Sequence, residues 1–160
     1  MRYGLVLAAA LILSGCRQAD GPVPTPTESV QEELVDVRRD LQNVAGGNAT
    51  APQELADDLR KYARRPEAHP AVDELSRRLV TALAGTDLGE QDAERLAHDL
   101  WLSMAAREIS ERQVEELQNN VQALLMSIGA TEETAQPVAV QFGEVQRAET
   151  DRPRRWYEFF

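Results

Sequence analysis

Twelve apolar residues between positions 72 and 142 recur at a spacing of 21, and they limit the folds that the chain can adopt. Within each repeat the apolar positions are three and four residues apart, which is the spacing of one face of an α-helix. The pattern predicts four helices with the same inward stripe, produced either by duplication or by helices and turns of similar length. The sets are Val72, Ala93, Val114 and Ala135, then Leu75, Leu96, Leu117 and Val138, then Leu79, Leu100, Val121 and Phe142.

Turn and capping residues separate these four stripes. Pro137 should delay or kink the start of the last helix, because its ring clashes with the preceding helical turn. The expected boundaries are Gly85, Leu88-Gly89-Glu90, Ile109-Ser110 with Gln113, and Gly129 with Thr131.

Two further helices are predicted before the repeat. The first has Thr25 as N-cap and ends at Gly46-Gly47, and the second has Thr50 as N-cap and ends before Arg65-Pro66. We therefore expect an all-α bundle of about six short helices over residues 26–148. Their inward residues are Val30, Leu34, Val37, Leu41 and Val44, followed by Leu55, Leu59 and Tyr62.

The first fifteen residues have the layout of a secretory signal peptide. Arg2 supplies a positive charge, residues 5–13 form an unbroken apolar run, and small residues follow. The run covers roughly half of the about 20 residues that a membrane-spanning helix needs. It is therefore suited to export rather than to permanent anchoring.

The residues Leu13-Ser14-Gly15-Cys16 resemble the lipobox of bacterial lipoproteins. The resemblance implies that a diacylglycerol, typically with palmitate among its acyl chains, is attached to the sulfur of Cys16 and that residues 1–15 are then removed. Residues 16–25 would be the lipidated cysteine and a flexible tether. The alternatives are an ordinary signal peptide followed by a free cysteine, or a soluble protein whose first helix is apolar. Arg17 occupies the position at which an aspartate would favour the inner membrane, so the resemblance implies the outer membrane, facing the periplasm, if the host has one.

Composition limits both how the fold is held together and which partners the chain can bind. Cys16 is the only cysteine, so no internal disulfide can form and the fold depends on packing. The net charge is −10, and −11 without Arg2. Such a chain repels phosphate groups, which argues against nucleic acid and against electrostatic attraction to anionic lipid. The expected partners are a membrane, through the lipid, and another envelope protein.

Residues suited to catalysis or metal binding are few. The only histidines are His69 and His98, so the usual zinc ligand sets cannot be assembled. Glu94 and His98 are four residues apart and could share a metal, but a solvated pair on a helix face is the preferred interpretation. Phosphate-loop, G-x-S-x-G and H-E-x-x-H motifs are absent from the sequence. We expect no enzyme activity, cofactor, metal or small-molecule substrate.

Residues 149–160 form a basic and aromatic tail after the acidic body. Residues 152–160 hold four of the eight aromatic residues of the chain and three arginines. One hypothesis is docking to a partner or to a membrane interface, because aromatic and arginine side chains dominate binding hot spots. The other is that the tail folds back on the bundle and pairs with its acidic helices. The docking residues would be Arg154, Arg155, Trp156, Tyr157, Phe159 and Phe160.

The segment Ile109-Ser110-Glu111-Arg112-Gln113 is similar to the L-T-x-x-Q motif of the Spy and CpxP family of periplasmic stress proteins. That family shows the motif twice, and the preceding repeat lacks it at Leu88-Gly89-Glu90-Gln91-Asp92. A hydrophobic staple with a capping box explains the same residues without a family.

The sequence thus indicates a membrane-anchored, non-enzymatic envelope lipoprotein that acts in binding or scaffolding. A stress chaperone or sensor of the Spy/CpxP type is the alternative, and an envelope hydrolase is a weaker one.

Overall fold

The computed structural model describes residues 28–105 and 109–150, and these residues form helices and turns without a strand. The predicted all-α bundle of six short helices is confirmed. The helices are α1 Glu28–Ala45, α2 Ala51–Tyr62, α3 His69–Leu83, α4 Glu90–Ala105, α5 Glu111–Ser127 and α6 Glu132–Thr150, with the short 3₁₀ helix η1, Pro66–Ala68, before α3.

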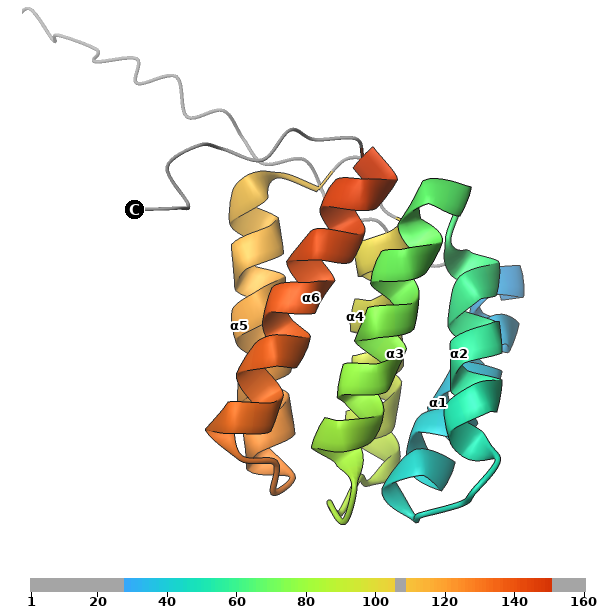
Figure 1. Cartoon of the computed structure of the whole chain (residues 1–160), viewed down its shortest axis with the longest axis vertical. Coiled ribbons are helices and arrows are strands. Elements are labelled where there is room, and N and C mark those ends of the chain that lie inside the picture. Colours follow the sequence, from blue (N-terminus) through green and yellow to red (C-terminus); the bar gives the residue numbers. More distant parts are fainter. Residues whose placement is uncertain (1–27, 106–108, 151–160) are drawn as a thin grey trace, which may run out of the picture.

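The helices run up and down in two layers (Figure 1). One layer has the order α5, α6, α3, α2, in which each helix packs against the next. Behind it, α4 packs on α6 and α1 packs on α2, while α1 and α4 also pack on each other. Among the described helices, only α6 and α4 pack closely on α5, so they leave one side of α5 uncovered.

The core consists of the predicted apolar stripes. All twelve residues of the 21-residue repeat are buried, and Leu75, Leu79 and Phe142 are among those with no exposed surface. In α1, Val37, Leu41 and Val44 are buried, whereas Val30 and Leu34 pack on the rim of the core. Helices of this length are marginal alone, so burial of these stripes supplies their stability.

Glycines end three helices at the predicted places. Gly47, Gly85 and Gly129 have φ values of 77°, 75° and 107° after α1, α3 and α5. A positive φ lets the backbone turn back and satisfy the last carbonyls of a helix, and it is strained for residues with a Cβ. These three positions therefore fix where the chain reverses.

The two hydroxyl caps predicted for α2 and α5 behave differently. Ser110 forms a full capping box, because its Oγ accepts from the backbone N–H of Gln113 at 3.2 Å and Gln113 Oε1 accepts from the backbone N–H of Ser110 at 2.7 Å. Thr50 precedes α2 as predicted but makes no side-chain cap. Its hydroxyl donates instead to Asn48 Oδ1 at 3.1 Å, because the preceding turn places that acceptor closer.

The expected delay of the last helix at Pro137 is wrong. α6 begins at Glu132 and continues through Pro137 as its sixth residue. Thr131 starts the helix, since its carbonyl accepts from the backbone N–H groups of Thr134 at 3.1 Å and Ala135 at 2.9 Å. Packing of α6 on α5, α3 and α4 outweighs the hydrogen bond that proline cannot donate.

α6 also includes Glu149 and Thr150, two residues beyond the boundary expected at 148. The predicted signal peptide, the tether, the cap at Thr25 and the tail from residue 151 lie outside the described residues.

Candidate functional site

The residues singled out for attachment and docking are not placed by the structure. Cys16 lies outside the described residues, and so do Arg154, Arg155, Trp156, Tyr157, Phe159 and Phe160. The candidate site is therefore built from the surface of the bundle, where α4 borders two grooves.

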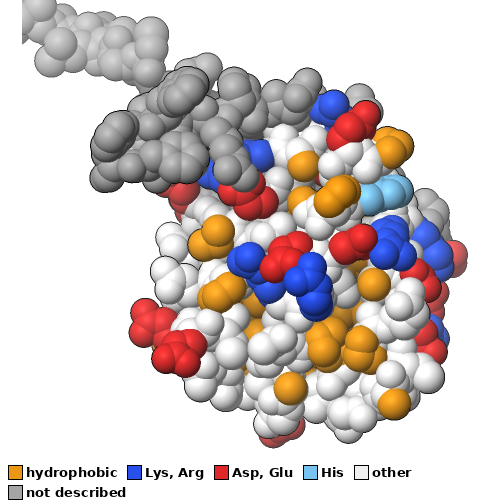
Figure 2. All heavy atoms as spheres, viewed as in Figure 1, with side chains coloured by type: hydrophobic (Ala, Val, Ile, Leu, Met, Phe, Trp, Pro, Cys, Tyr) orange, Lys and Arg blue, Asp and Glu red, His pale blue; other side chains and the backbone are white. Residues whose placement is uncertain are grey.

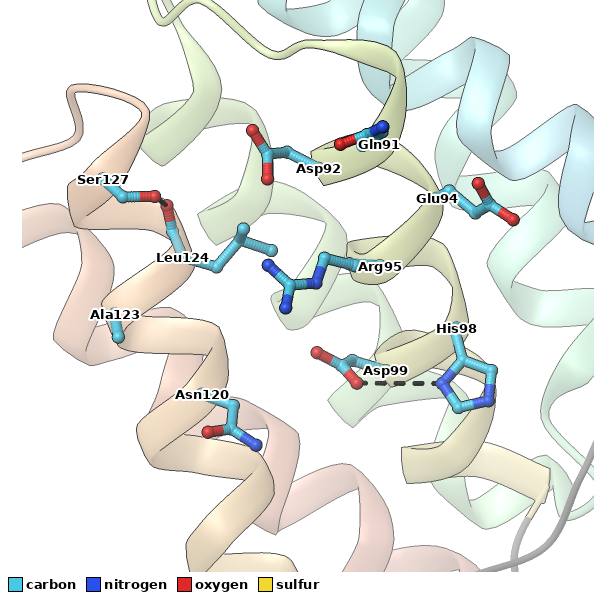
Figure 3. Close-up of a pocket in the computed structure, with 10 residues that line it drawn as sticks. All are labelled: Gln91, Asp92, Glu94, Arg95, His98, Asp99, Asn120, Ala123, Leu124 and Ser127. Atoms are coloured by element: carbon cyan, nitrogen blue, oxygen red, sulfur yellow. Dashed lines mark hydrogen bonds and ion pairs between the residues drawn. The ribbon is translucent and has the colours of Figure 1, made fainter.

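The larger groove has a volume of about 1130 Å³ and lies between α4 and α5 (Figure 3). It forms because both helices rest on α6 while making little contact with each other. Arg95 points from α4 toward α5, between Asp92 and Asp99 (Figure 3). Its lining residues are Gln91, Asp92, Glu94, Arg95, His98, Asp99, Asn120, Ala123, Leu124 and Ser127.

The carboxylates of this groove are incompletely neutralised. Among the described residues, Asp92 and Glu94 have no ion-pair partner within 4.0 Å. Asp99 Oδ1 lies 3.9 Å from His98 Nδ1, an ion pair only when the imidazole is protonated. The groove is open and polar, so its shape suits contact with a polypeptide better than enclosure of a small molecule.

The smaller groove, about 400 Å³, lies between α1 and α4. Leu34, Val35 and Ala97 give it an apolar lining, and Glu94 and His98 border it as they border the larger groove. Val35 is 48% exposed, which is unusual for a large apolar residue in this fold.

Glu94 and His98 share a helix face as expected. The His98 ring lies 5.8 Å from the Trp101 ring, tilted by 42°. Within residues 28–105 and 109–150, no group of three or more His, Cys, Asp or Glu residues is placed to hold a metal ion. His69 is the first residue of α3.

A pair of carboxyl groups lies at the contact between α1 and α2. Asp40 is 1% exposed, and among the described residues its Oδ2 atom has no hydrogen-bond partner. Burial, followed by the hydrogen bond and charge of Asp58, raises the pKa of Asp40 to about 6. Arg39, whose Nε lies 3.8 Å from Asp40 Oδ1, acts in the opposite direction, and the charge of Glu54 adds to the increase.

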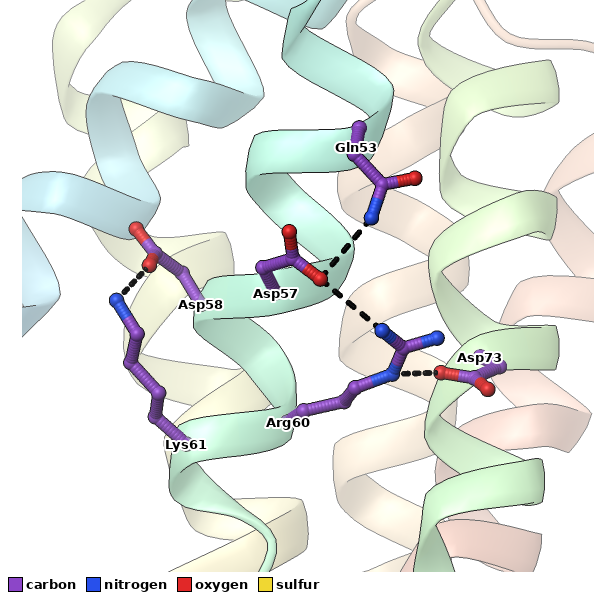
Figure 4. Close-up of polar contacts among 6 residues, drawn as sticks. All are labelled: Gln53, Asp57, Asp58, Arg60, Lys61 and Asp73. Atoms are coloured by element: carbon purple, nitrogen blue, oxygen red, sulfur yellow. Dashed lines mark hydrogen bonds and ion pairs between the residues drawn. The ribbon is translucent and has the colours of Figure 1, made fainter.

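Asp58 also belongs to a group of hydrogen-bonded and ion-paired side chains on the outer surface of α2 and α3 (Figure 4). Lys61 Nζ donates to Asp58 Oδ1 at 2.5 Å. Arg60 donates to Asp57 Oδ1 at 3.0 Å and to Asp73 Oδ1 of α3 at 2.6 Å. The Arg60 guanidinium holds the pKa of Asp73 below its usual range. Arg60, Asp57 and Asp73 are about 40% exposed or more, so solvent screens the contacts between them. The Asp58 side chain is only 18% exposed.

Buried polar groups also gather near the end of α6. Glu149 Oε1 accepts from the backbone N–H of Arg64 at 3.0 Å, which ties α6 to the connection between α2 and α3. Burial raises the pKa of Glu149, and hydrogen bonds from the backbone N–H groups of Arg65 and Arg64 oppose the increase. Gln146 is 1% exposed, and within the described part of the chain neither of its amide atoms has a hydrogen-bond partner.

The segment that resembles the L-T-x-x-Q motif serves as the start of α5. Ser110 and Gln113 form the capping box, and Ile109 and Val114 are buried on either side of it. The capping box is as predicted, and local structure accounts for Ile109, Ser110 and Gln113 of this segment.

Sequence reasoning missed Asp40 and the grooves. Asp40 directly precedes the inward residue Leu41, and a position beside the stripe becomes buried when a helix has neighbours on two sides, as α1 has in α2 and α4. The grooves depend on which helices pack together, and the sequence pattern carries no signal for that.

None of the described helices is both long and apolar enough to cross a membrane. No protein-family model, curated protein or solved structure matches the chain.

Proposed function

We propose that this protein is a lipid-anchored lipoprotein of the bacterial cell envelope, whose helical bundle acts as a non-enzymatic binding or scaffolding module. The observation that carries the proposal is the sequence Leu13-Ser14-Gly15-Cys16 directly after the apolar run of residues 5–13. The only cysteine of the chain stands where the lipid would be attached. Two or three acyl chains, at about 0.8 kcal/mol per buried methylene, hold a protein firmly on a membrane.

Arg17 supports an address at the outer membrane, facing the periplasm, in a host that has one. The binding role is supported by the two grooves beside α4, which are open and bordered by charged side chains. Such surfaces suit another envelope protein as partner. The tether of residues 16–25 would give the bundle reach above the membrane.

Intact-mass measurement of the protein purified from membranes tests the anchor. We expect the loss of residues 1–15 and the added mass of a diacylglycerol on residue 16, both abolished by Cys16→Ser. In a Gram-negative host, Arg17→Asp should move the protein to the inner membrane and leave the mass of the lipid unchanged. An unmodified Cys16 in the native product would refute the proposal.

The binding role is tested in intact cells with a photoreactive side chain at Gln91, inside the α4–α5 groove, and at the exposed Val140 of α6 as control. We expect a product of higher mass from position 91 and none from position 140. Equal crosslinking at both positions would count against the groove as the binding surface.

A further inference from the structure

The negative charge of the chain is concentrated in the stretch of sequence that contains α4 and α5. Residues 28–150 carry 24 acidic and 12 basic side chains, a net charge of −12. Residues 87–133, which contain α4 and α5, carry 11 acidic and three basic side chains, a net charge of −8. Residues 28–86 carry a net charge of only −3, from 11 acidic and eight basic side chains.

On the face formed by α6, α3 and α2, basic side chains neutralise acidic ones through ion pairs. Basic side chains lie beside acidic ones on the face formed by α6, α3 and α2 (Figure 2). Arg78 contacts Glu74 at 2.6 Å on α3, and Arg147 contacts Glu144 at 3.1 Å on α6. A basic segment would therefore be attracted to the α4–α5 side rather than to this face.

The groove is also the place where packing is incomplete. α5 is covered by α6 on one side, and its other side faces the groove, where Asn120 and Ala123 are exposed. Beneath them, Leu124 is 9% exposed and belongs to the core. A volume of about 1130 Å³ with an apolar residue at its base can accommodate several aromatic side chains with arginines among the carboxylates.

The chain itself holds a segment of matching chemistry. Ten residues follow Thr150, and they contain Arg152, Arg154 and Arg155 with four aromatic residues. α6 ends at the same end of the bundle as α5 begins (Figure 1). Ten extended residues span up to about 33–36 Å, whereas α5, with 17 residues, is about 26 Å long. The tail can therefore round the α4–α5 connection and enter the groove.

We propose that residues 151–160 dock in the α4–α5 groove of their own chain, with Arg154 and Arg155 facing Asp99, which lies six residues before the end of α4, and the aromatic side chains that follow covering Leu124. The docked tail neutralises part of the acidic lining of the groove. This intramolecular contact is independent of the lipid anchor, so its test leaves the anchor out.

The test uses the full chain with Cys16→Ser, kept in a non-ionic detergent, so that introduced cysteines are the only thiols. One variant adds Asn120→Cys and Phe159→Cys, which the proposal places close together. The control adds Val140→Cys and Phe159→Cys. Val140 is exposed on α6 and lies ten residues from Thr150, as Asn120 lies nine residues from the start of α5. In both variants the cysteine on the bundle therefore lies a similar number of helical residues from the end of the bundle at which the tail begins.

Under mild oxidant at low protein concentration, we expect the groove pair to form an intramolecular disulfide at least about fivefold faster than the control pair, because docking raises the effective concentration of the two thiols. Adding Arg154→Glu and Arg155→Glu should reduce that rate to the control value, and so should high salt. Circular dichroism of every variant checks that the bundle is folded. Equal rates for the two pairs would overturn the proposal, and so would disulfide-linked dimers as the main product.

Discussion

Asp40 is the residue whose environment departs most from what its type prefers. Carboxylates are rarely fully buried without a cationic partner. Asp40 is 1% exposed, and its nearest cation, the Arg39 guanidinium, is 3.8 Å away. Its other neighbours include the carboxyl of Asp58, so ionisation places two negative charges together at the α1–α2 contact.

This environment predicts a stability that depends on pH. The pKa of Asp40 is about 6 in the folded protein and 3.8 when unperturbed. The folded state therefore binds more protons between these values, so the contribution is complete below pH 3.8 and is lost as the pH rises through 6. A shift of about two units corresponds to at most about 3 kcal/mol.

Asp40→Asn should remove this loss of stability at high pH, because a buried amide carries no charge at any pH. We expect the variant to be about 1–3 kcal/mol more stable than the parent at pH 8 and nearly equal to it below pH 3.8. Urea denaturation at both pH values measures the difference. Asp36→Asn, on the exposed side of α1, is the control and should keep the parent's pH dependence. An identical pH dependence for Asp40→Asn and the parent would refute the prediction.

At the scale of the element, helix starts that look alike in the sequence differ in how they are capped. Ser110 and Thr50 both carry a hydroxyl with a glutamine three residues later. Only Ser110 and Gln113 exchange hydrogen bonds, whereas Thr50 donates to Asn48. The extended backbone of Ser110, with φ −70° and ψ 162°, points its side chain at the free N–H groups, and the helical backbone of Thr50 does not.

Ser110→Ala should therefore cost about 1 kcal/mol, the usual loss for an N-cap, and Thr50→Ala less than about 0.5 kcal/mol. Denaturant unfolding of the two variants beside the parent measures both values. Equal losses would mean that the capping box at Ser110 does not stabilise α5.

The contact between α5 and α6 depends on a glycine. A Cβ on Gly143 would lie 2.6 Å from Gln118 Nε2, the atom that donates to the carbonyl of Ala139 at 3.0 Å. The missing side chain thus makes room for an amide that bonds one helix to the next.

Gly143→Ala should gain helix propensity but displace this amide, so the net change in the parent should stay within about 1 kcal/mol. In a Gln118→Ala background, the same substitution should stabilise the protein by up to about 1 kcal/mol. A double-mutant cycle measures the coupling between the two sites, which we expect to be at least about 0.5 kcal/mol. Additive effects would show that the close contact has no energetic consequence.

At the scale of the whole molecule, excess negative charge opposes compaction. The chain has 27 acidic and 17 basic side chains, and the excess lies mainly on the α4–α5 side. Its ion pairs are mostly exposed, so their contribution is small, whereas repulsion among many like charges adds up.

Raising the salt from about 20 mM to about 300 mM should therefore raise the Tm by a few degrees, because screening weakens the repulsion more than the exposed ion pairs. Calorimetry at the two salt concentrations measures the change. Neutralising Asp92, Glu94 and Glu115 as amides should reduce this dependence on salt.

Matched neutralisation of Asp57, Asp73 and Glu74, whose carboxylates are paired with arginines, provides the control. These amide variants should lower the Tm at low salt. A Tm of the parent that falls with added salt would show that ion pairs outweigh the repulsion.

The sequence by itself determined the helices, their inward stripes and most of their ends. Val72, Leu75 and Leu79 and their counterparts at steps of 21 are all buried, because helical periodicity is local and identifies one apolar face per segment. Helix ends are also set by local residues. The predicted boundaries at Gly85, Gly129 and the Ser110–Gln113 capping box are therefore found in the structure.

Only the tertiary structure decided which helices became neighbours, and the candidate site depends on that arrangement. The α4–α5 groove exists because α4 and α5 both pack on α6 while α1 covers another side of α4. The same packing buried Asp40 beside Asp58 and carried α6 through Pro137. Local preferences of about 1–3 kcal/mol per residue give way when the burial of a whole apolar face opposes them.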